Sequence, residues 1–154
     1  HGLGLIAGSR GQFDQAADYF ARAAKLSPMD PRILGDLGYA RLRAGDPAGA
    51  RVPLGQAAEL APDSGKVLAN LALLLLVEGE PARAQQVMDR AKLGDEARSQ
   101  VLRLASEIRS QAAAPVAAAP AADAASTRVS RGDSFVMPVM SPLMDRLGNG
   151  PIMR

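Results

Sequence analysis

The chain has no cysteine and no tryptophan, and its single histidine is the first of its 154 residues, His1. The lack of cysteine excludes disulfides, thiolate metal sites and thiol nucleophiles, and it leaves the redox compartment open. Because His1 stands alone at the end, no Ser-His-Asp arrangement can be drawn, and no residue cluster has the spacing of a metal site. We therefore expect no catalytic activity, no cofactor and no metal.

Aromatic residues, excess charge and long apolar runs are also scarce. Aromatics make up 3% of the chain, so a core must come from Ala, Leu, Val and Met, which suits closely packed helices. The 18 basic residues are balanced by 16 acidic ones, which argues against a nucleic-acid partner. The apolar run from Leu71 to Val77 is far below the roughly 20 residues that span a bilayer. We expect no membrane span here.

Small residues, in contrast, recur at a constant spacing. Gly11, Gly45 and Gly79 follow one another at intervals of 34 residues. The same interval separates Ala16, Ala50 and Ala84; Leu3, Leu37 and Leu71; Phe20, Leu54 and Met88; and the small residues Gly4, Gly38 and Ala72, while Pro28 and Pro62 end two of the units. Recurrence of many positions at one spacing indicates a helical repeat protein, in which each repeat is a helix-turn-helix unit.

The repeat predicts an all-α solenoid of about three such units. The first helix of each unit is expected at residues 1–10, 31–44 and 65–78, and the second at 13–26, 47–60 and 81–92. The recurring glycines fall where a left-handed cap ends the first helix, and Pro47 and Pro81 suit the first turn of the second. The recurring small residues let the paired helices approach, and Leu3 and its equivalents fill the space between layers.

Two further segments complete the predicted architecture. Residues 95–112 show apolar residues at helical spacing and are expected to form a capping helix, which makes 1–112 one domain. Residues 113–154 begin with an Ala/Pro tract and end in a Met/Pro-rich stretch, and we expect a disordered linker and tail that could include a docking segment. Helix 47–60 is expected to kink or fray because Pro53 removes an internal hydrogen bond.

These features resemble the tetratricopeptide-repeat (TPR) pattern over about two-thirds of the chain. The strings Leu37-Gly38-Tyr39, Gln56 to Asp63 and Asn70 to Leu73 are similar, more narrowly, to the TadD-like lipoproteins of tight-adherence (Flp) pilus assembly. The resemblance implies a periplasmic protein that assists the outer-membrane secretin, anchored through a lipidated cysteine upstream of His1. The chain starts without Met inside an apolar pattern, so we expect it to be part of a longer protein.

A TPR stack binds peptides or helices along the concave face made by the first helices of its units. The side chains expected there are Arg32, Asp36, Tyr39, Arg43, Lys66, Asn70, Leu73 and Val77. Asn70 is the sharpest candidate because an amide can pair with both groups of a peptide backbone. Each position also has a structural interpretation: Tyr39, Leu73 and Val77 could pack between helices, and the charged residues could be solvated.

Three functional hypotheses stay open at this point. The first is a non-catalytic interaction scaffold that holds a segment of the pilus secretin in the concave groove. The second is a cytoplasmic TPR co-chaperone or adaptor, although Gly35 and Tyr39 stand where a chaperone-binding carboxylate clamp needs polar side chains. The third is the TPR helper region of a larger enzyme. The short match Arg131-Gly132-Asp133 to a cell-adhesion motif is treated as coincidence.

Overall fold

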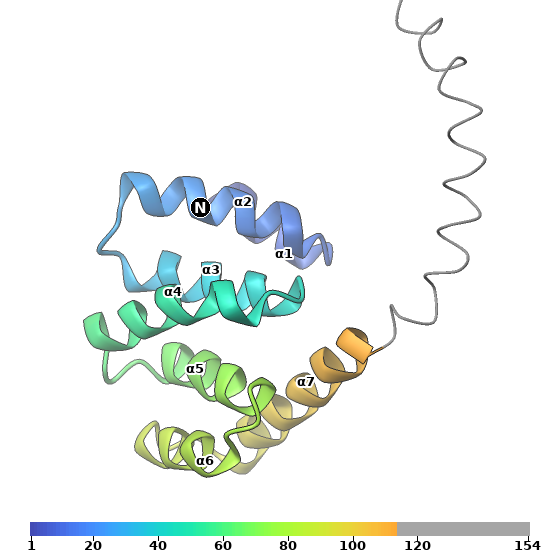
Figure 1. Ribbon diagram of the computed structural model, residues 1–154. Helices are drawn as coiled ribbons and strands as arrows, with labels where there is room; N and C mark the ends of the chain where they lie inside the picture. The colour runs from blue at the N-terminus through green and yellow to red at the C-terminus, as the bar shows by residue number, and fades with distance from the viewer. Residues whose placement is uncertain (114–154) are drawn as a thin grey trace, which may run out of the picture. The chain divides into compact units, whose positions relative to one another are not determined.

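The computed structural model describes residues 1–113, which form seven α-helices and contain no strand (Figure 1). The helices are α1 (Gly2–Ser9), α2 (Phe13–Leu26), α3 (Pro31–Arg43), α4 (Pro47–Leu60), α5 (Gly65–Val77), α6 (Pro81–Arg90) and α7 (Asp95–Ala113). The expected linker, docking segment and Arg131-Gly132-Asp133 triplet lie outside the described residues. No helix within residues 1–113 is both long and apolar enough to cross a bilayer.

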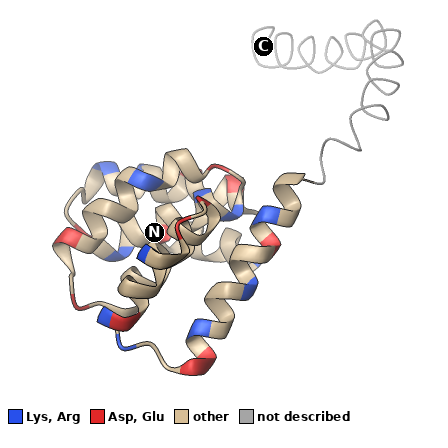
Figure 2. Ribbon diagram, turned by 60° about the horizontal axis from the view of Figure 1, so that its bottom comes forward, with Lys and Arg blue, Asp and Glu red and all other residues tan. Residues whose placement is uncertain are grey.

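Three helix pairs stack in chain order, and a single helix follows them (Figure 1). Each pair is one repeat: α1 packs on α2, α3 on α4, and α5 on α6. Successive repeats touch because α2 packs on α3 and α4 packs on α5. Basic and acidic residues are interspersed along the helices (Figure 2). The predicted all-α solenoid is confirmed.

The recurring glycines end the first helix of each repeat. Gly11, Gly45 and Gly79 have φ of +73°, +86° and +82°, in the left-handed region that favours a residue without Cβ. After Gly45, for example, the Asp46 N–H donates to the Arg41 carbonyl at 2.8 Å, and the Gly45 N–H donates to the Leu42 carbonyl at 3.1 Å, which are the two bonds of a Schellman cap. The predicted turn chemistry is confirmed in all three repeats.

Small residues set the distance between paired helices. A Cβ atom at Gly4 would lie 2.5 Å from the ring of Phe20, and one at Gly38 would overlap Leu54. From the opposite helix, Ala16, Ala50 and Ala84 are fully buried. The prediction that these positions allow close approach is confirmed.

The prediction that Leu3 packs between layers is wrong, because 60% of its surface is exposed. Its equivalent Leu37 is buried in one cluster with Ala16 and Phe20 of α2, the second helix of the preceding repeat. Within the described stack α1 is the first helix, so Leu3 has no counterpart of α2 to pack against.

The expected fraying at Pro53 does not occur, because α4 runs through to Leu60. A proline at position 53 cannot donate to the carbonyl of Gly49, four residues earlier. That carbonyl instead accepts a hydrogen bond of 2.8 Å from the guanidinium of Arg41 in α3. The same glycine donates its N–H to the N-cap residue Asp46. Tertiary contacts therefore replace the bond that the proline removes.

The third repeat differs from the other two at its end. The helix α6 ends at Arg90, two residues earlier than expected, in a Schellman turn whose left-handed residue is Lys92, with φ of 52°. Arg98 of α7 donates to the carbonyls of Leu93 and Met88 and so ties the turn to α7. The helix α7 then packs against α5 rather than continuing the regular stack.

Candidate functional site

A groove of about 370 Å³ crosses the first helices of the three repeats. It is lined by α1, by the middle and end of α3, by the start of α5, and by aromatic residues of α2. Five of the eight predicted binding residues line it, namely Asp36, Tyr39, Arg43, Lys66 and Asn70. The structure thus brings side chains that are up to 34 residues apart to one groove, and their contact with a partner stays a prediction.

Two aromatic rings and one guanidinium form a wall of the groove. The rings of Phe13 and Tyr39 meet edge to face, with their centroids 6.3 Å apart. The Arg43 guanidinium carbon lies 4.4 Å from the centroid of Phe13, and its Nη1 donates to the Tyr39 hydroxyl at 2.8 Å. Stacking on the ring and bonding to the hydroxyl together restrict the rotamers of Arg43.

A carboxylate lies at the floor of the groove. Asp36 is only 6% exposed, and its two oxygens are bound by different helices. The His1 Nε2 lies 2.8 Å from Oδ2, and the Lys66 ammonium donates to Oδ1 at 2.7 Å. A buried carboxylate needs such partners because burial alone disfavours its charge. Asp36 therefore links three repeats at the floor of the groove instead of projecting freely from it.

Asn70 also links repeats. Its amide nitrogen donates to the backbone carbonyl of Gly35 in the preceding repeat at 3.3 Å. The Asn70 side chain is half-buried and lines the groove, and its amide oxygen can accept a hydrogen bond from a ligand. Pairing of Asn70 with a bound peptide backbone stays a prediction.

The structure places two predicted residues elsewhere. Leu73 is 1% exposed and belongs to the core cluster that includes Val101, Ala105 and Ile108 of α7. Val77 is half-buried and packs against that cluster. The prediction that Leu73 and Val77 form an apolar wall of the groove is wrong. The helix α7 covers the side of α5 that corresponds to the groove-lining side of α3. The alternative interpretation, that they pack on neighbouring helices, is the one observed.

Arg32 is exposed and lies outside the groove lining. Its guanidinium pairs with Asp30, the N-cap residue of α3, at 3.0 Å. The hydrogen bond from Arg32 holds the pKa of the Asp30 carboxyl below its ordinary value, and the same bond raises the pKa of Arg32. Arg32 therefore belongs to a helix-capping arrangement.

Leu5, Ser9 and Phe13 are among the groove residues that the sequence analysis did not predict. Leu5 and Ser9 of α1 stand 34 residues before Tyr39 and Arg43, so the repeat itself could have identified them. Phe13 belongs to α2, and its repeat equivalents are Pro47 and Pro81. No periodic signal marks Phe13, since only the packing of α2 brings its ring to Tyr39.

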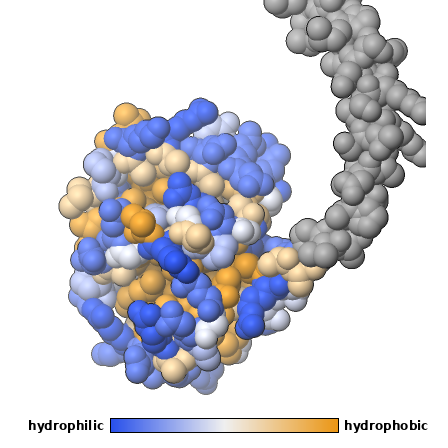
Figure 3. Space-filling view, in the orientation of Figure 1, coloured by the Kyte–Doolittle hydropathy of each residue, from blue (hydrophilic) through white to orange (hydrophobic). Residues whose placement is uncertain are grey.

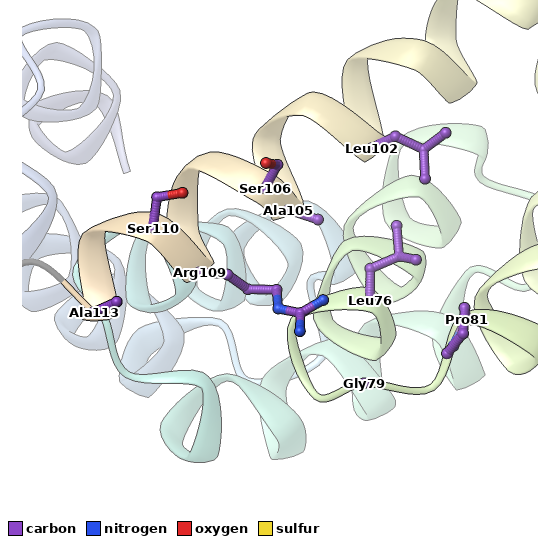
Figure 4. A pocket seen from close by; sticks show the side chains of 9 residues that line it. All are labelled: Leu76, Gly79, Pro81, Leu102, Ala105, Ser106, Arg109, Ser110 and Ala113. Atoms are coloured by element: carbon purple, nitrogen blue, oxygen red, sulfur yellow. The ribbon is translucent and has the colours of Figure 1, made fainter.

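A second cleft, of about 500 Å³, lies between α7 and the turn that joins α5 to α6 (Figure 4). Leu76, Leu102 and Ala105 contribute apolar side chains, and Arg109 extends from α7 toward the turn at Gly79. Figure 3 shows apolar surface between α5 and α7 in this region. None of the predicted binding residues lines the second cleft, so the groove is the stronger candidate site.

The lining of the groove combines polar and apolar side chains, as binding surfaces do. Across residues 1–113, no three His, Asp or Glu side chains are grouped so as to hold a metal ion. The groove offers a guanidinium, an ammonium, an amide and a phenol beside exposed apolar groups, which suits reversible contacts with a peptide.

Comparison with known proteins gives the family. Two models described as tetratricopeptide repeat match the chain, one over residues 1–65 and the other over residues 41–108. Among curated proteins, none matches the chain. The two matched ranges overlap over residues 41–65, which include α4 of the second repeat, and together they extend from α1 into α7. The chain belongs to the tetratricopeptide-repeat family.

Proposed function

We propose that this protein is a non-catalytic scaffold that binds a segment of another protein in the groove across α1, α3 and α5. Membership of the TPR family supports protein–protein interaction in general. One observation supports this groove as the binding site: five predicted binding residues, from two repeats, line it together. The groove has a volume of about 370 Å³, so we expect it to hold one short segment of the partner.

The finer proposal concerns the partner. The strings Leu37-Gly38-Tyr39 and Gln56 to Asp63 resemble the TadD-like lipoproteins, and on that ground we propose a component of a Flp pilus secretin as partner and the periplasm as location. The alternative proposals are a cytoplasmic co-chaperone or adaptor, and the helper region of a larger enzyme. A lipobox upstream of His1 would favour the pilus proposal, and a catalytic domain upstream would favour the helper region of an enzyme.

The groove is tested by a matched pair of substitutions. Leu5 lines the groove and is 47% exposed, whereas Leu102 lines the second cleft and is 51% exposed. Leu5→Asp should abolish capture of the partner, because a charge in the apolar part of the groove must be desolvated. Leu102→Asp should leave capture unchanged. Circular dichroism of both variants checks that the helices are intact.

The partner is tested by affinity capture from a bacterial envelope extract, with the full chain as bait. Recovery of a secretin that is lost with Leu5→Asp and kept with Leu102→Asp would support the pilus proposal. Recovery of cytosolic chaperones or of an enzyme with the same dependence would overturn the pilus proposal and keep the scaffold. A captured protein that depends on Leu102 and not on Leu5 would place binding in the second cleft instead.

A further inference from the structure

We infer that the groove selects a partner segment with an aspartate or glutamate beside a large apolar side chain, and that Arg43 is the group that receives the carboxylate. This inference rests on the proposed function, since it names the chemistry of the segment held in the same groove. It follows from the charges along the groove, the geometry of Arg43 and the apolar surface beside it.

Among the described residues 1–113, one of the cations that line the groove has no carboxylate partner. Of the three charged lining residues, Asp36 and Lys66 form an ion pair of 2.7 Å with one another. Arg43 takes part in none of the ion pairs found among residues 1–113. A half-buried guanidinium that faces a groove attracts an anion from the ligand, because opposite charges interact more strongly there than in bulk water.

Arg43 is held in place before any ligand binds. Its guanidinium lies over the Phe13 ring and 5.8 Å from the centroid of Tyr39, whose hydroxyl accepts one of its five N–H groups. The remaining N–H groups can donate to a carboxylate, which guanidinium binds through two parallel bonds. Because stacking already restricts the side chain, little rotamer entropy is lost on binding.

Apolar surface lies next to this cation. Leu5 is exposed on α1, and Phe13 is half-buried beside Arg43. A segment with a carboxylate alone would leave these groups in contact with water, and a purely apolar segment would desolvate Arg43 without pairing it. A carboxylate beside a Leu, Ile or Phe side chain satisfies both parts of the groove.

The experiment selects short random peptides on phage against the full chain. The best binder with an acidic residue is then synthesised in two labelled forms, as selected and with that residue changed to its amide, and binding is measured by fluorescence anisotropy. We expect the amide form to bind about ten-fold more weakly, the effect of losing one charge-assisted pair. Peptides that bind in the groove without any acidic residue would overturn the inference.

Protein variants separate recognition from structure. Arg43→Gln should weaken the acidic peptide about ten-fold and leave the amide peptide unchanged, whereas a merely structural role would weaken both equally. Arg22→Gln is the matched control, because Arg22 also lies over a tyrosine ring, that of Tyr19, but outside the groove. Selected peptides that are all indifferent to Leu5→Asp would overturn the proposed function itself. Equal affinities for the two peptide forms, with Leu5 still required, would overturn only the inference.

Discussion

At the scale of single residues, the carbonyl of Gly49 shows how one side chain allows a proline inside a helix. Pro53 withholds the N–H that this carbonyl would accept, and Arg41 supplies the donor from the neighbouring helix. The half-buried carbonyl would otherwise lose its hydrogen bond, at a cost of about 1–3 kcal/mol. The two residues are therefore energetically coupled although they lie in different helices.

This coupling can be measured with a double-mutant cycle. Arg41→Ala should lower the free energy of unfolding by about 1–2 kcal/mol in urea titrations, because the Gly49 carbonyl loses its donor. In a Pro53→Ala background the backbone N–H returns, so the same Arg41→Ala change should cost clearly less. An equal cost in both backgrounds would show that Arg41 acts through other contacts.

Gly38 and Gly55 give a second residue-scale prediction with opposite signs. Gly38→Ala should destabilise the protein by about 1–3 kcal/mol, because the added methyl group overlaps Leu54 in the partner helix. Gly55→Ala should stabilise it by up to about 1 kcal/mol, because a Cβ there meets nothing within 4 Å and α4 gains a better helix former. Thermal unfolding of both variants decides the matter, and a stabilising Gly38→Ala would contradict the close packing.

The residues that the sequence could predict are those that repeat. The left-handed glycines and the small residues of the helix pairs each have one local reason for their identity, and the 34-residue spacing reveals them. Arg41 and Asp36 have partners in other helices, at positions where the other repeats carry different residues. The role of Asp36 depends on contacts between repeats, and the role of Arg41 depends on Pro53, whose repeat equivalents are Tyr19 and Val87. The 34-residue spacing reveals neither role.

At the scale of helices, the end of α6 is the least regular turn. Lys92 adopts the left-handed conformation that glycine adopts in the three other Schellman turns. A residue with a Cβ pays a steric penalty there of roughly 1 kcal/mol. This turn also explains why the expected helix 81–92 was too long, since no glycine or proline marks its end.

The penalty leads to a direct prediction. Lys92→Gly should raise the free energy of unfolding by about 0.5–1 kcal/mol, because the turn keeps its hydrogen bonds and loses the Cβ clash. Lys92→Ala is the control: it removes the long side chain but keeps the Cβ, so the stability should hardly change. Urea titrations of the two variants distinguish them, and equal effects would mean that the side chain, not the backbone, matters.

The capping helix was predicted at nearly its observed bounds, but its contacts were not. Residues 95–112 were expected to cover the last repeat, and α7 does so through Val101, Ala105 and Ile108. The amphipathic pattern indicates that α7 has a buried face, yet it cannot tell whether α5 or α6 receives it. Leu73 was assigned to the groove for that reason, because the repeat alone places it at the same position as Tyr39.

At the scale of the described molecule, residues 1–113 contain a core that is continuous from α3 to α7. Leu42 and Leu54 belong to the same buried cluster as Leu73 and Ile108, so repeats two and three and α7 share one core. Such shared burial predicts that these helices unfold together, as neighbouring units do in repeat proteins.

Truncation tests this cooperativity. A chain that ends after Ala113 should keep the melting temperature of the full chain, because it retains all seven helices and the buried clusters that they form. A chain that ends after Gly94 lacks α7, exposes Leu73 and should melt at a markedly lower temperature or fail to fold. Full stability without α7 would show that the packing of α7 on α5 contributes little.

The position of α7 also gives the groove a direction. At the α5 end, α7 occupies the side on which the groove would continue, because Leu73, the repeat equivalent of Tyr39, is buried in one cluster with Val101, Ala105 and Ile108 of α7. A ligand lengthened past α5 would meet the capping helix. We therefore expect that lengthening a bound segment at its α5 end leaves its affinity unchanged, so that α7 limits the length of ligand that the groove can use in that direction.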